Sequence, residues 1–405
     1  MNSKELFALG LGLQKPWEVA KISFEENELE KFRTLHIHID FASGSLFKDP
    51  DGFEGKVHDT VERTWQHLNF FQHKCFLHAR VPRIVDGKDK VKTVTVPWAR
   101  EGSGFTLLFE AFSMMLIESE MPVRKAAKLL LVNAQRLWTI FHYWVRRAHE
   151  NDVVGNLKTV GFDETSSRKG HNYVTTMVDL DERRVLYAVQ GKDSECIAKS
   201  AQYLEAKGVS PTRIEQICID MSPAYISGCE KSFPQASITF DKFHVVKEVN
   251  KAMDELRKEE SKHIAELRGH RFTFLKNKIT SARETVREEL LNLYPKLGDG
   301  YKLKELFNEL WSIGNREDAD SFLTFWCDQV KDSGIKSFVK AVKMIKSHWN
   351  GILNYIESRI TSGIIEGLNA KIQLAKRRAR GYSNIDNFIN MIYLTCGKLK
   401  FDYPL

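Results

Sequence analysis

The chain has 405 residues, of which 42% are hydrophobic and 28% are charged, and its formal net charge is +7. This length predicts two or three domains, and the composition excludes intrinsic disorder, a collagen-like repeat and a small scaffold held by disulfides. The basic excess permits a polyanionic partner without proving one. No apolar run reaches the roughly eighteen residues of a membrane span, and the amino terminus lacks a signal-peptide pattern, so we expect no membrane contact. The six cysteines form no C-x-x-C pair, which favours reduced thiols and a cytoplasmic location.

Residues 1–100 are predicted to form strands and loops. Alternation of apolar and polar residues predicts strands at 35–39 and 91–96, and the Gly-, Asp- and Lys-rich stretch 44–55 is predicted to be a loop. From Phe105 onward the apolar period becomes that of a helix.

Residues 121–148 predict two short helices with a break near Asn133. The first helix has apolar residues at i, i+3, i+4 and i+7 counted from Val123, with Pro122 where a first turn tolerates it, and the second repeats the pattern from Leu137. Two amphipathic helices with a tight link fit a helix-turn-helix that reads DNA. A generic helical hairpin fits as well, and these residues alone favour it.

The segment that follows alternates strands and helices. Strands are predicted at 159–163, 171–180, 184–189, 216–220 and 237–241, with one helix from Asp193 to Gly208 and another from Ser222 to just before Pro234. The order strand, strand, strand, helix, strand, helix, strand is that of the ribonuclease-H-like fold, a mixed sheet flanked by helices.

The rest of the chain is predicted to be helical. Residues 245–358 suggest an almost continuous helical insertion, interrupted by a loop at Asp299-Gly300. The last long helix is predicted from Thr361 to Arg380, with Gly381 as its carboxyl-terminal cap.

Three carboxylates stand where a metal site could form. Asp163 and Asp220 each end an apolar strand, and these two strands are neighbours in the expected sheet, so the two side chains should converge. Glu366, at the head of the last long helix, could meet them over the sheet. Hard oxygen ligands of this kind suit Mg²⁺ or Mn²⁺. Each residue taken singly is more commonly a loop cap or a helix-dipole partner, so the prediction depends on all three together.

Other polar residues near these positions are given supporting roles. Asp241 ends the next strand and is the chief rival for the second ligand. With His244 it forms a D-x-x-H pair whose spacing could place both residues beside the site, although a lone histidine between a strand and a helix is more commonly structural. Glu164 should point to the opposite sheet face from Asp163, which favours a structural role. A polar stripe at helical spacing follows Glu366: Asn369, Gln373 and Arg377.

Basic residues near the carboxylates and in the helix pair are candidates for contact with a DNA backbone. One group forms a turn after the first strand of the sheet, and another ends the last long helix. Solvated surface is the alternative interpretation of both groups. The candidates are Arg168, Lys169, His171, Lys376, Arg377, Arg378, Arg380, Arg136 and Arg124.

Three blocks of the sequence resemble the catalytic blocks of the ISL-three family of bacterial insertion-sequence transposases. They are GFDETSSRKGHNYVTTMVDLDERRVL, DMSPAYISGCEKSFPQASITFDKFHVVKEVNKAMDELR and SGIIEGLNAKIQLAKRRARGYSNIDNF. The segments RTWQHLNFF, LHARVPR and VPWAREGSGFTLLFEAF resemble the family's amino-terminal arm, so the match covers nearly the whole chain. The resemblance implies that Asp163, Asp220 and Glu366 are the DDE triad, and that Asp241 and His244 match a D-x-x-H element seen in several DDE transposase groups.

The implied fold is an α/β multidomain chain with a ribonuclease-H-like catalytic core. The expected domains are a β-rich arm (1–100), a helix-turn-helix (101–150), the first part of the core (155–244), an all-helical insertion (245–358) and the final core helices (359–405). The family's arm typically carries a zinc ribbon of two C-x-x-C pairs, and here the corresponding places are 49–52 and 86–89, without a thiolate. We therefore expect no structural zinc and an arm packed around Trp65, Phe70 and Phe71.

The function implied by the resemblance is DNA transposition. The enzyme would bind terminal inverted repeats, cleave a DNA strand with two Mg²⁺ or Mn²⁺ ions, and transfer the freed 3′-hydroxyl to target DNA. Asp163 would bridge both ions, with Asp220 and Glu366 each completing one coordination shell. Two ends require two active sites, so a homodimer on double-stranded DNA, associated with the bacterial nucleoid, is expected.

Two other functions are compatible with these residues. One is a domesticated, non-mobile DNA-binding protein derived from a transposase, against which the intact triad argues. The other is a ribonuclease-H-like DNA nuclease, against which the arm and the large helical insertion argue.

Overall fold

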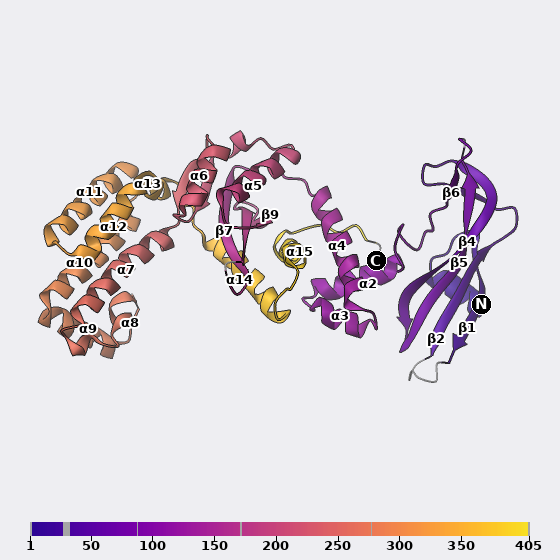
Figure 1. Ribbon diagram of the computed structural model, residues 1–405, viewed down its shortest axis with the longest axis horizontal. Coiled ribbons are helices and arrows are strands. Elements are labelled where there is room, and N and C mark those ends of the chain that lie inside the picture. Colours follow the sequence, from indigo (N-terminus) through magenta and orange to yellow (C-terminus); the bar gives the residue numbers. More distant parts are fainter. Residues whose placement is uncertain (1, 27–32, 87, 171, 277, 404–405) are drawn as a thin grey trace. The chain divides into compact units, whose positions relative to one another are not determined.

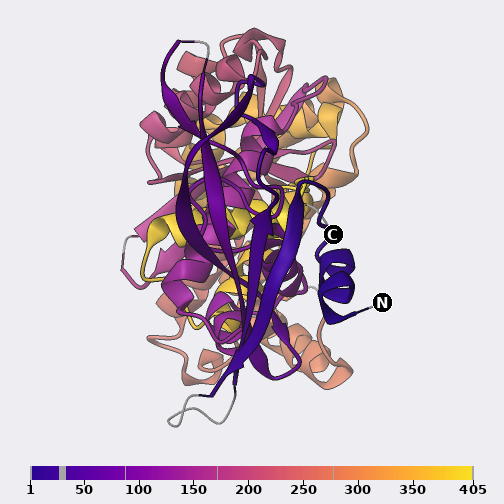
Figure 2. The same ribbon diagram turned by 90° about the vertical axis from the view of Figure 1, so that its right-hand side faces the viewer.

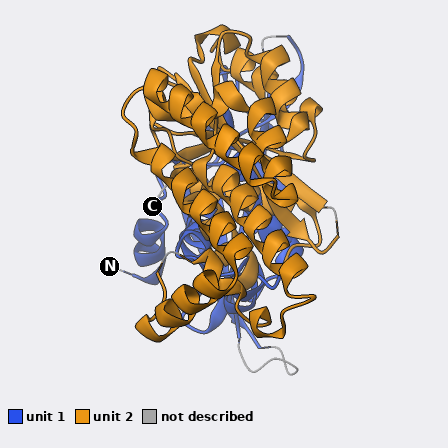
Figure 3. Ribbon diagram, turned by 90° about the vertical axis from the view of Figure 1, so that its left-hand side faces the viewer, with its two compact units in different colours: residues 1–152, 378–380, 399–405 blue, residues 153–377, 381–398 orange. Residues whose placement is uncertain are grey.

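The computed structural model describes residues 2–26, 33–86, 88–170, 172–276 and 278–403. The chain forms two compact units, which Figure 3 shows in different colours. The first comprises residues 1–152, 378–380 and 399–405, and the second comprises residues 153–377 and 381–398. Each unit contains its own β-sheet with both parallel and antiparallel pairs. No helix within the described ranges is long and apolar enough to cross a membrane.

A helix and a six-stranded sheet form the first part of the first unit, and Figure 2 looks onto this sheet. The elements are α1 (Ser3–Gly10), β1 (Trp17–Glu25), β2 (Thr34–Phe41), β3 (Leu46–Lys48), β4 (Glu54–Phe70), β5 (His73–Val85) and β6 (Val91–Thr93). The strand order is β1-β2-β5-β4-β3, with β6 pairing β5, and β2 and β5 run parallel.

Alternating burial along β2 confirms the strand predicted at 35–39. Leu35, Ile37 and Ile39 are at most 2% exposed and pack with Trp65 in the core of this sheet. Phe71, which we expected in this core, is 81% exposed. It occupies the turn between β4 and β5 with φ of 55°, and its side chain lies on the surface beside Phe70.

The loop predicted at 44–55 is only partly a loop. It contains β3, which pairs with the first residues of β4. The Asp49 carboxylate accepts hydrogen bonds from the backbone N–H groups of Asp51 and Phe53, at 2.9 and 2.8 Å, and so closes a tight turn between the two strands. The strand predicted at 91–96 is shorter than expected and spans Val91–Thr93.

Three helices follow in the first unit: α2 (Leu107–Glu118), α3 (Val123–Leu129) and α4 (Ala134–Asn151). The predicted break near Asn133 is confirmed, because the Asn133 side chain accepts a hydrogen bond from the backbone N–H of Gln135 and starts α4. Glu110 of α2 is fully buried; its carboxylate pairs with Arg100 at 2.9 Å and accepts a hydrogen bond from Trp144 Nε1 at 2.8 Å.

The segment 399–403 packs on α4. The Arg147 guanidinium pairs with the Asp402 carboxylate at 2.8 Å, and the ring of Trp144 meets the ring of Tyr403 edge-on at 5.6 Å. The Tyr403 hydroxyl also donates a hydrogen bond to Glu118 of α2. This segment therefore belongs structurally to the first unit, although more than two hundred residues separate it from α4 in the chain.

The second unit is built on a five-stranded sheet in the order β11-β10-β7-β8-β9. The strands are β7 (Thr159–Arg168), β8 (Asn172–Asp179), β9 (Arg184–Gln190), β10 (Gln216–Ile219) and β11 (Ser237–Phe240). β7, β10 and β11 run parallel, and β8 and β9 are antiparallel to their neighbours. The predicted order of elements is confirmed, and β7 is longer than predicted because its ladder with β8 continues to Arg168.

Helices cover both faces of this sheet (Figure 1). They are α5 (Ser194–Ala206), α6 (Pro223–Ser232), α14 (Gly363–Arg378) and α15 (Ile385–Cys396). Phe162 of β7 packs toward Phe233 at the end of α6, with ring centroids 6.0 Å apart. Its neighbour Gly161 faces α14 so closely that a Cβ there would lie 2.4 Å from Ile365 Cδ1. Successive residues of β7 thus contact helices on opposite faces.

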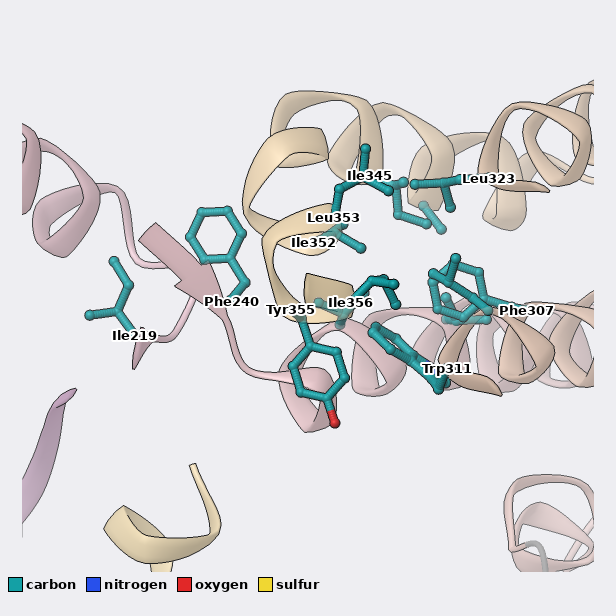
Figure 4. Close-up of a cluster of buried hydrophobic side chains, with 14 of the residues drawn as sticks. Ile219, Phe240, Phe307, Trp311, Leu323, Ile345, Ile352, Leu353, Tyr355 and Ile356 are labelled. Carbon is teal, nitrogen blue, oxygen red and sulfur yellow. The ribbon is translucent and has the colours of Figure 1, made fainter. Parts of the chain in front are cut away.

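The segment between β11 and α14 is helical, as predicted. Its helices are α7 (Lys242–Glu260), α8 (Arg271–Leu275), α9 (Ser281–Leu293), α10 (Pro295–Glu309), α11 (Arg316–Ser333), α12 (Lys336–Ser347) and α13 (Trp349–Ser358). Their core is continuous with the core of the sheet. Figure 4 shows Phe240 of β11 between Ile219 of β10 and Ile352 of α13, with Phe307 and Trp311 beyond.

The loop predicted at Asp299-Gly300 is wrong, because both residues lie inside α10. Gly300 is buried against α7, where a Cβ would approach Leu256 Cδ2 to 2.3 Å. Close helix packing, and not a chain reversal, accounts for glycine at this position.

Candidate active site

Adjacent strands of the second sheet end in carboxylates at the same edge. Gly161 of β7 pairs with Cys218 of β10 in parallel, and Asp163 and Asp220 each lie two residues beyond that pair. Asp241 directly follows β11, the strand on the other side of β10. Because parallel strands present equivalent residues side by side, the register itself brings these acidic positions together.

Each oxygen of the Asp163 carboxylate accepts a hydrogen bond. The backbone N–H of Glu164 donates to Oδ1 at 2.8 Å, and Asn369 Nδ2 of α14 donates to Oδ2 at 2.7 Å. Burial raises the pKa of Asp163 to about 6, and the nearby carboxylates of Glu164 and Asp220 add to the rise. Burial, together with the charges of Glu164 and Asp220, thus makes ionisation of Asp163 costly, and a bound cation would offset this cost.

Glu164 interacts electrostatically with Asp163 and Asp220, although its position on the strand suggests a separate structural role. Its place in the β7–β8 ladder, next to Asp163, assigns it to the opposite sheet face by alternation. Burial and then the charge of Asp220 nevertheless raise the pKa of Glu164, while the charge of Lys192 lowers it. Asp220 itself accepts a hydrogen bond from the backbone N–H of Ser222 at 2.9 Å, which fixes its turn into α6.

Asp241 and His244 form a pair at the start of α7. Asp241 is 1% exposed, and His244 Nδ1 lies 3.2 Å from its Oδ2. Burial opposes ionisation of Asp241, but its contacts with His244 and Ser362 outweigh burial and leave its pKa lowered. The contact with Asp241, followed by the charges of Asp220 and Asp163, raises the pKa of His244. The neighbouring carboxylates therefore favour the protonated form of His244, and burial opposes it.

Glu366 lies in the first turn of α14 and is exposed. Ser362 Oγ donates a hydrogen bond to its Oε1 at 3.4 Å, and Ser362 also contacts Asp241. The structure therefore links Glu366 to Asp241, while Asn369, one helical turn further on, makes the contact with Asp163. Among the described residues, no group of three or more His, Cys, Asp or Glu side chains is arranged to hold a metal ion.

The polar stripe of α14 is partly used to hold the helix on β7. Gln373 Nε2 donates to Thr165 Oγ1 at 2.6 Å, and Lys376 Nζ donates to the Ser166 carbonyl at 2.6 Å. Burial lowers the pKa of Lys376, one of the residues predicted to contact DNA. Its ammonium group is already hydrogen-bonded within the protein. The basic run in which it lies did not indicate this contact.

The other predicted DNA contacts have different surroundings. Arg168, Lys169 and Arg377 are exposed, as are Arg124 of α3 and Arg380 just after α14. Two are engaged within the first unit: Arg378 pairs with Glu120, and Arg136 stacks on the Phe105 ring with its guanidinium carbon 4.1 Å from the centroid. His171 lies outside the described residues.

Two turns of the arm bind a shared ammonium group. Asp86 Oδ1 accepts hydrogen bonds from the backbone N–H groups of Lys88 and Lys90, at 2.8 and 2.9 Å, in the same way that Asp49 closes its own turn. Lys92 Nζ lies 3.0 Å from Asp86 Oδ2, 2.5 Å from Asp51 Oδ2 and 3.5 Å from Asp49 Oδ2. The lysine thus joins the turn at 49–53 to the turn at 86–90.

Three family models match this chain. A model described as a transposase matches residues 160–392, which include Asp163, Asp220 and Glu366. A model described as the helix-turn-helix domain of transposase family ISL3 matches residues 94–145, and this confirms the helix-turn-helix over the generic hairpin. A third, described as the zinc finger of the transposases of IS204, IS1001, IS1096 and IS1165, matches residues 53–85.

Two known transposases are similar along most of the chain. The transposase for insertion sequence element IS1001 of Bordetella parapertussis is 26% identical over 369 residues, covering 88% of this chain and 90% of that protein. The transposase for insertion sequence element IS1557 of Mycobacterium tuberculosis is 24% identical, covering 98% of this chain and 96% of that protein. A chain from a cryo-EM structure of a simian T-cell lymphotropic virus intasome with PP2A regulatory subunit B56 gamma is 14% identical, covering 43% of this chain and 66% of that chain. Its TM-score of 0.17 is too low to bear on the fold.

The zinc-finger match overturns the expectation of no structural zinc for the arm. That expectation relied on the missing C-x-x-C pairs, whereas the model recognises the strands between the two turns, residues 53–85. Those strands are the paired β4 and β5. The segment therefore matches the family's zinc finger, although the turns on either side of it contain no cysteine.

The matched segments follow one another along the chain and coincide with its structural elements. The helix-turn-helix model spans α2, α3 and most of α4, and the transposase model runs from β7 into α15, across the edge where the acidic residues gather. The relatives are similar to this chain over nearly their whole lengths. The chain therefore belongs to the ISL3 family of bacterial insertion-sequence transposases, enzymes that cleave and transfer DNA strands.

Proposed function

We propose that Asp163, Asp220 and Glu366 are the DDE triad of a ribonuclease-H-like core, and that they hold two Mg²⁺ or Mn²⁺ ions during strand cleavage and transfer. The observation that carries this proposal is the matched register of Asp163 and Asp220 on neighbouring parallel strands. Their oxygens are the hard donors that these cations prefer, and the crowding of negative charge around Asp163 suits a cation. Glu366 precedes Asn369 by three residues, about 4.5 Å along the helix axis, and Asn369 contacts Asp163.

The bound cations would activate the attacking oxygen and stabilise the leaving oxygen at phosphorus. Asp163, Asp220 and Glu366 would together hold these cations. Asp241 and His244 would act beside the site: Asp241 holds Ser362, which in turn contacts Glu366. His244 would offset part of the negative charge at the strand ends.

DNA would be bound on several surfaces. The helix-turn-helix and the arm would recognise the terminal inverted repeats, with Arg124 exposed on α3 for contact. Exposed cations next to the core, such as Arg168, Lys169 and Arg377, would hold phosphates of the element end or of target DNA. Two ends require two active sites, so we propose a homodimer on DNA. We further propose the five-domain division predicted from the sequence, except that residues 399–403 pack with the first unit. The protein would be associated with the nucleoid.

The decisive experiment replaces Asp163 by Asn and uses double-stranded DNA that carries the element ends. Mg²⁺-dependent strand cleavage should disappear while binding of the ends persists, because amide and carboxylate have the same shape but the amide is a poor ligand for a hard cation. Asp181→Asn, an exposed position in the turn after β8, is the matched control and should cleave normally. Cleavage at the original rate by Asp163→Asn would refute the proposal.

A further inference from the structure

Helix α14 is joined to β7 by three side chains that form one row along the helix. Gln373 and Lys376 contact Thr165 and Ser166, which carry no charge. Asn369 differs from both because its partner is the carboxylate of Asp163. Attachment of the helix is therefore shared among several contacts, and the contact of Asn369 has a different chemical consequence.

The two hydrogen bonds on Asp163 define the plane of its carboxylate. One comes from the backbone of Glu164 and the other from Asn369, and each uses a different oxygen. An ionised carboxylate offers about two acceptor positions on each oxygen, so one position on each oxygen stays open. A carboxylate that holds a divalent cation needs open acceptor positions and a fixed plane.

We infer that Asn369 is a positioning residue for Asp163, which sets the carboxylate plane and leaves one lone pair on each oxygen for a divalent cation. This inference rests on the proposed function of Asp163. Partners that orient a metal ligand in this way typically contribute about 10- to 100-fold in metal affinity or activity.

The choice of an amide at position 369 fits this role. An amide donates a hydrogen bond without bringing a charge, so the negative charge of the site remains available to the cation. A lysine at this position would itself neutralise Asp163. An aspartate would add another negative charge beside a carboxylate whose pKa is already raised by burial and by the charges of Glu164 and Asp220. A donor without charge holds the ligand and does not compete with the metal.

The test uses the full-length protein and Mn²⁺ as the probe. Binding of Mn²⁺ is followed by loss of the free-ion electron paramagnetic resonance signal, without DNA, for the original protein and for Asn369→Ala and Gln373→Ala. Gln373→Ala is the matched control, because it removes an amide of the same kind from the same helix and the same strand contact. Thermal unfolding of both variants reports any general loosening of α14.

The inference predicts that Asn369→Ala raises the Mn²⁺ concentration for half-saturation by about 10- to 100-fold, while Gln373→Ala leaves it unchanged. Cleavage of element-end DNA by Asn369→Ala should recover as Mn²⁺ is raised to saturation. In an Asp163→Asn background, Asn369→Ala should cause no further loss of Mn²⁺ affinity, because its effect on the metal passes through the Asp163 carboxylate. Equal weakening in both alanine variants, or no change in Asn369→Ala, would overturn the inference. If Asp163→Asn itself cleaves normally, the proposed function fails instead, so the two failures are distinct.

Discussion

Replacing Gly161 by alanine tests how closely α14 must approach β7 for the site to form. An added Cβ would lie 2.4 Å from Ile365 Cδ1, and 3.2 Å from both Ile365 Cγ1 and Leu180 Cδ2. Carbon atoms in contact normally stay about 3.5 to 4.0 Å apart, so the closest approach is short by more than about 1 Å. Both sides of this contact are buried, so the strain has little room to relax. We expect a loss of about 1–3 kcal/mol in the free energy of unfolding of the second unit.

The same substitution should weaken the acidic site. Asp163 is two residues from Gly161 on β7, and Glu366 directly follows Ile365 on α14. Pushing the helix away from the strand would lengthen the hydrogen bond from Asn369 to Asp163. Strand cleavage should therefore fall in Gly161→Ala, even though no candidate catalytic side chain has been changed.

A double-mutant cycle provides the measurement. Ile365→Val removes Cδ1, the atom in closest contact, at its own cost of about 0.5–1.5 kcal/mol. Because this makes space for the new Cβ, the double variant should be less destabilised than the sum of the single variants. Urea unfolding followed by hydrogen exchange of the β7 amides reports the second unit separately from the first. Additivity within about 0.5 kcal/mol would show that the two positions are not coupled and would refute the reasoning.

Three further predictions concern the arm and DNA binding. Burial lowers the pKa of His67 to about 4, so the unfolded chain binds the proton first as the pH falls. The free energy of unfolding of the first unit should be constant above about pH 7 and fall by about 2 kcal/mol between pH 7 and 5. Unfolding measured across this pH range would detect the loss, and His67→Asn should largely remove it. Lys92→Met should lower the melting temperature of the arm, because it leaves Asp49, Asp51 and Asp86 without their shared cation. Adding Asp86→Asn should restore part of the lost melting temperature, and no recovery would argue against the ion-pair explanation. Arg377→Ala should weaken binding to DNA and reduce the slope of log affinity against log salt by about 1, as measured by fluorescence anisotropy, whereas an unchanged slope would exclude a phosphate contact.

The core of the second unit could be predicted because its signals are local. Asp163 and Asp220 follow short apolar runs, and the order of strands and helices leaves few arrangements of the sheet. Their matched register then follows from two parallel strands of known order. Helix starts such as Asn133 were likewise predictable, since a cap involves neighbouring residues only.

What could not be predicted depends on how distant segments meet. Glu366 and Asn369 stand on one helix with similar polarity, and only the packing of α14 decides which of them contacts Asp163. Lys376 belongs to a basic run, but its ammonium group is occupied by a carbonyl more than two hundred residues away. Gly300 seemed to mark a loop because close approach of α7 has no local signature.

The tail that packs on α4 affects how the protein can be divided for experiments. Residues 1–152 alone would lack Asp402 and Tyr403, and so would expose the surface of Trp144 and leave Arg147 without its carboxylate. A hybrid that exchanges the helix-turn-helix between two relatives should therefore carry the matching tail with it. Grafting residues 399–403 back through a flexible linker would be the simplest way to study DNA recognition without the catalytic half.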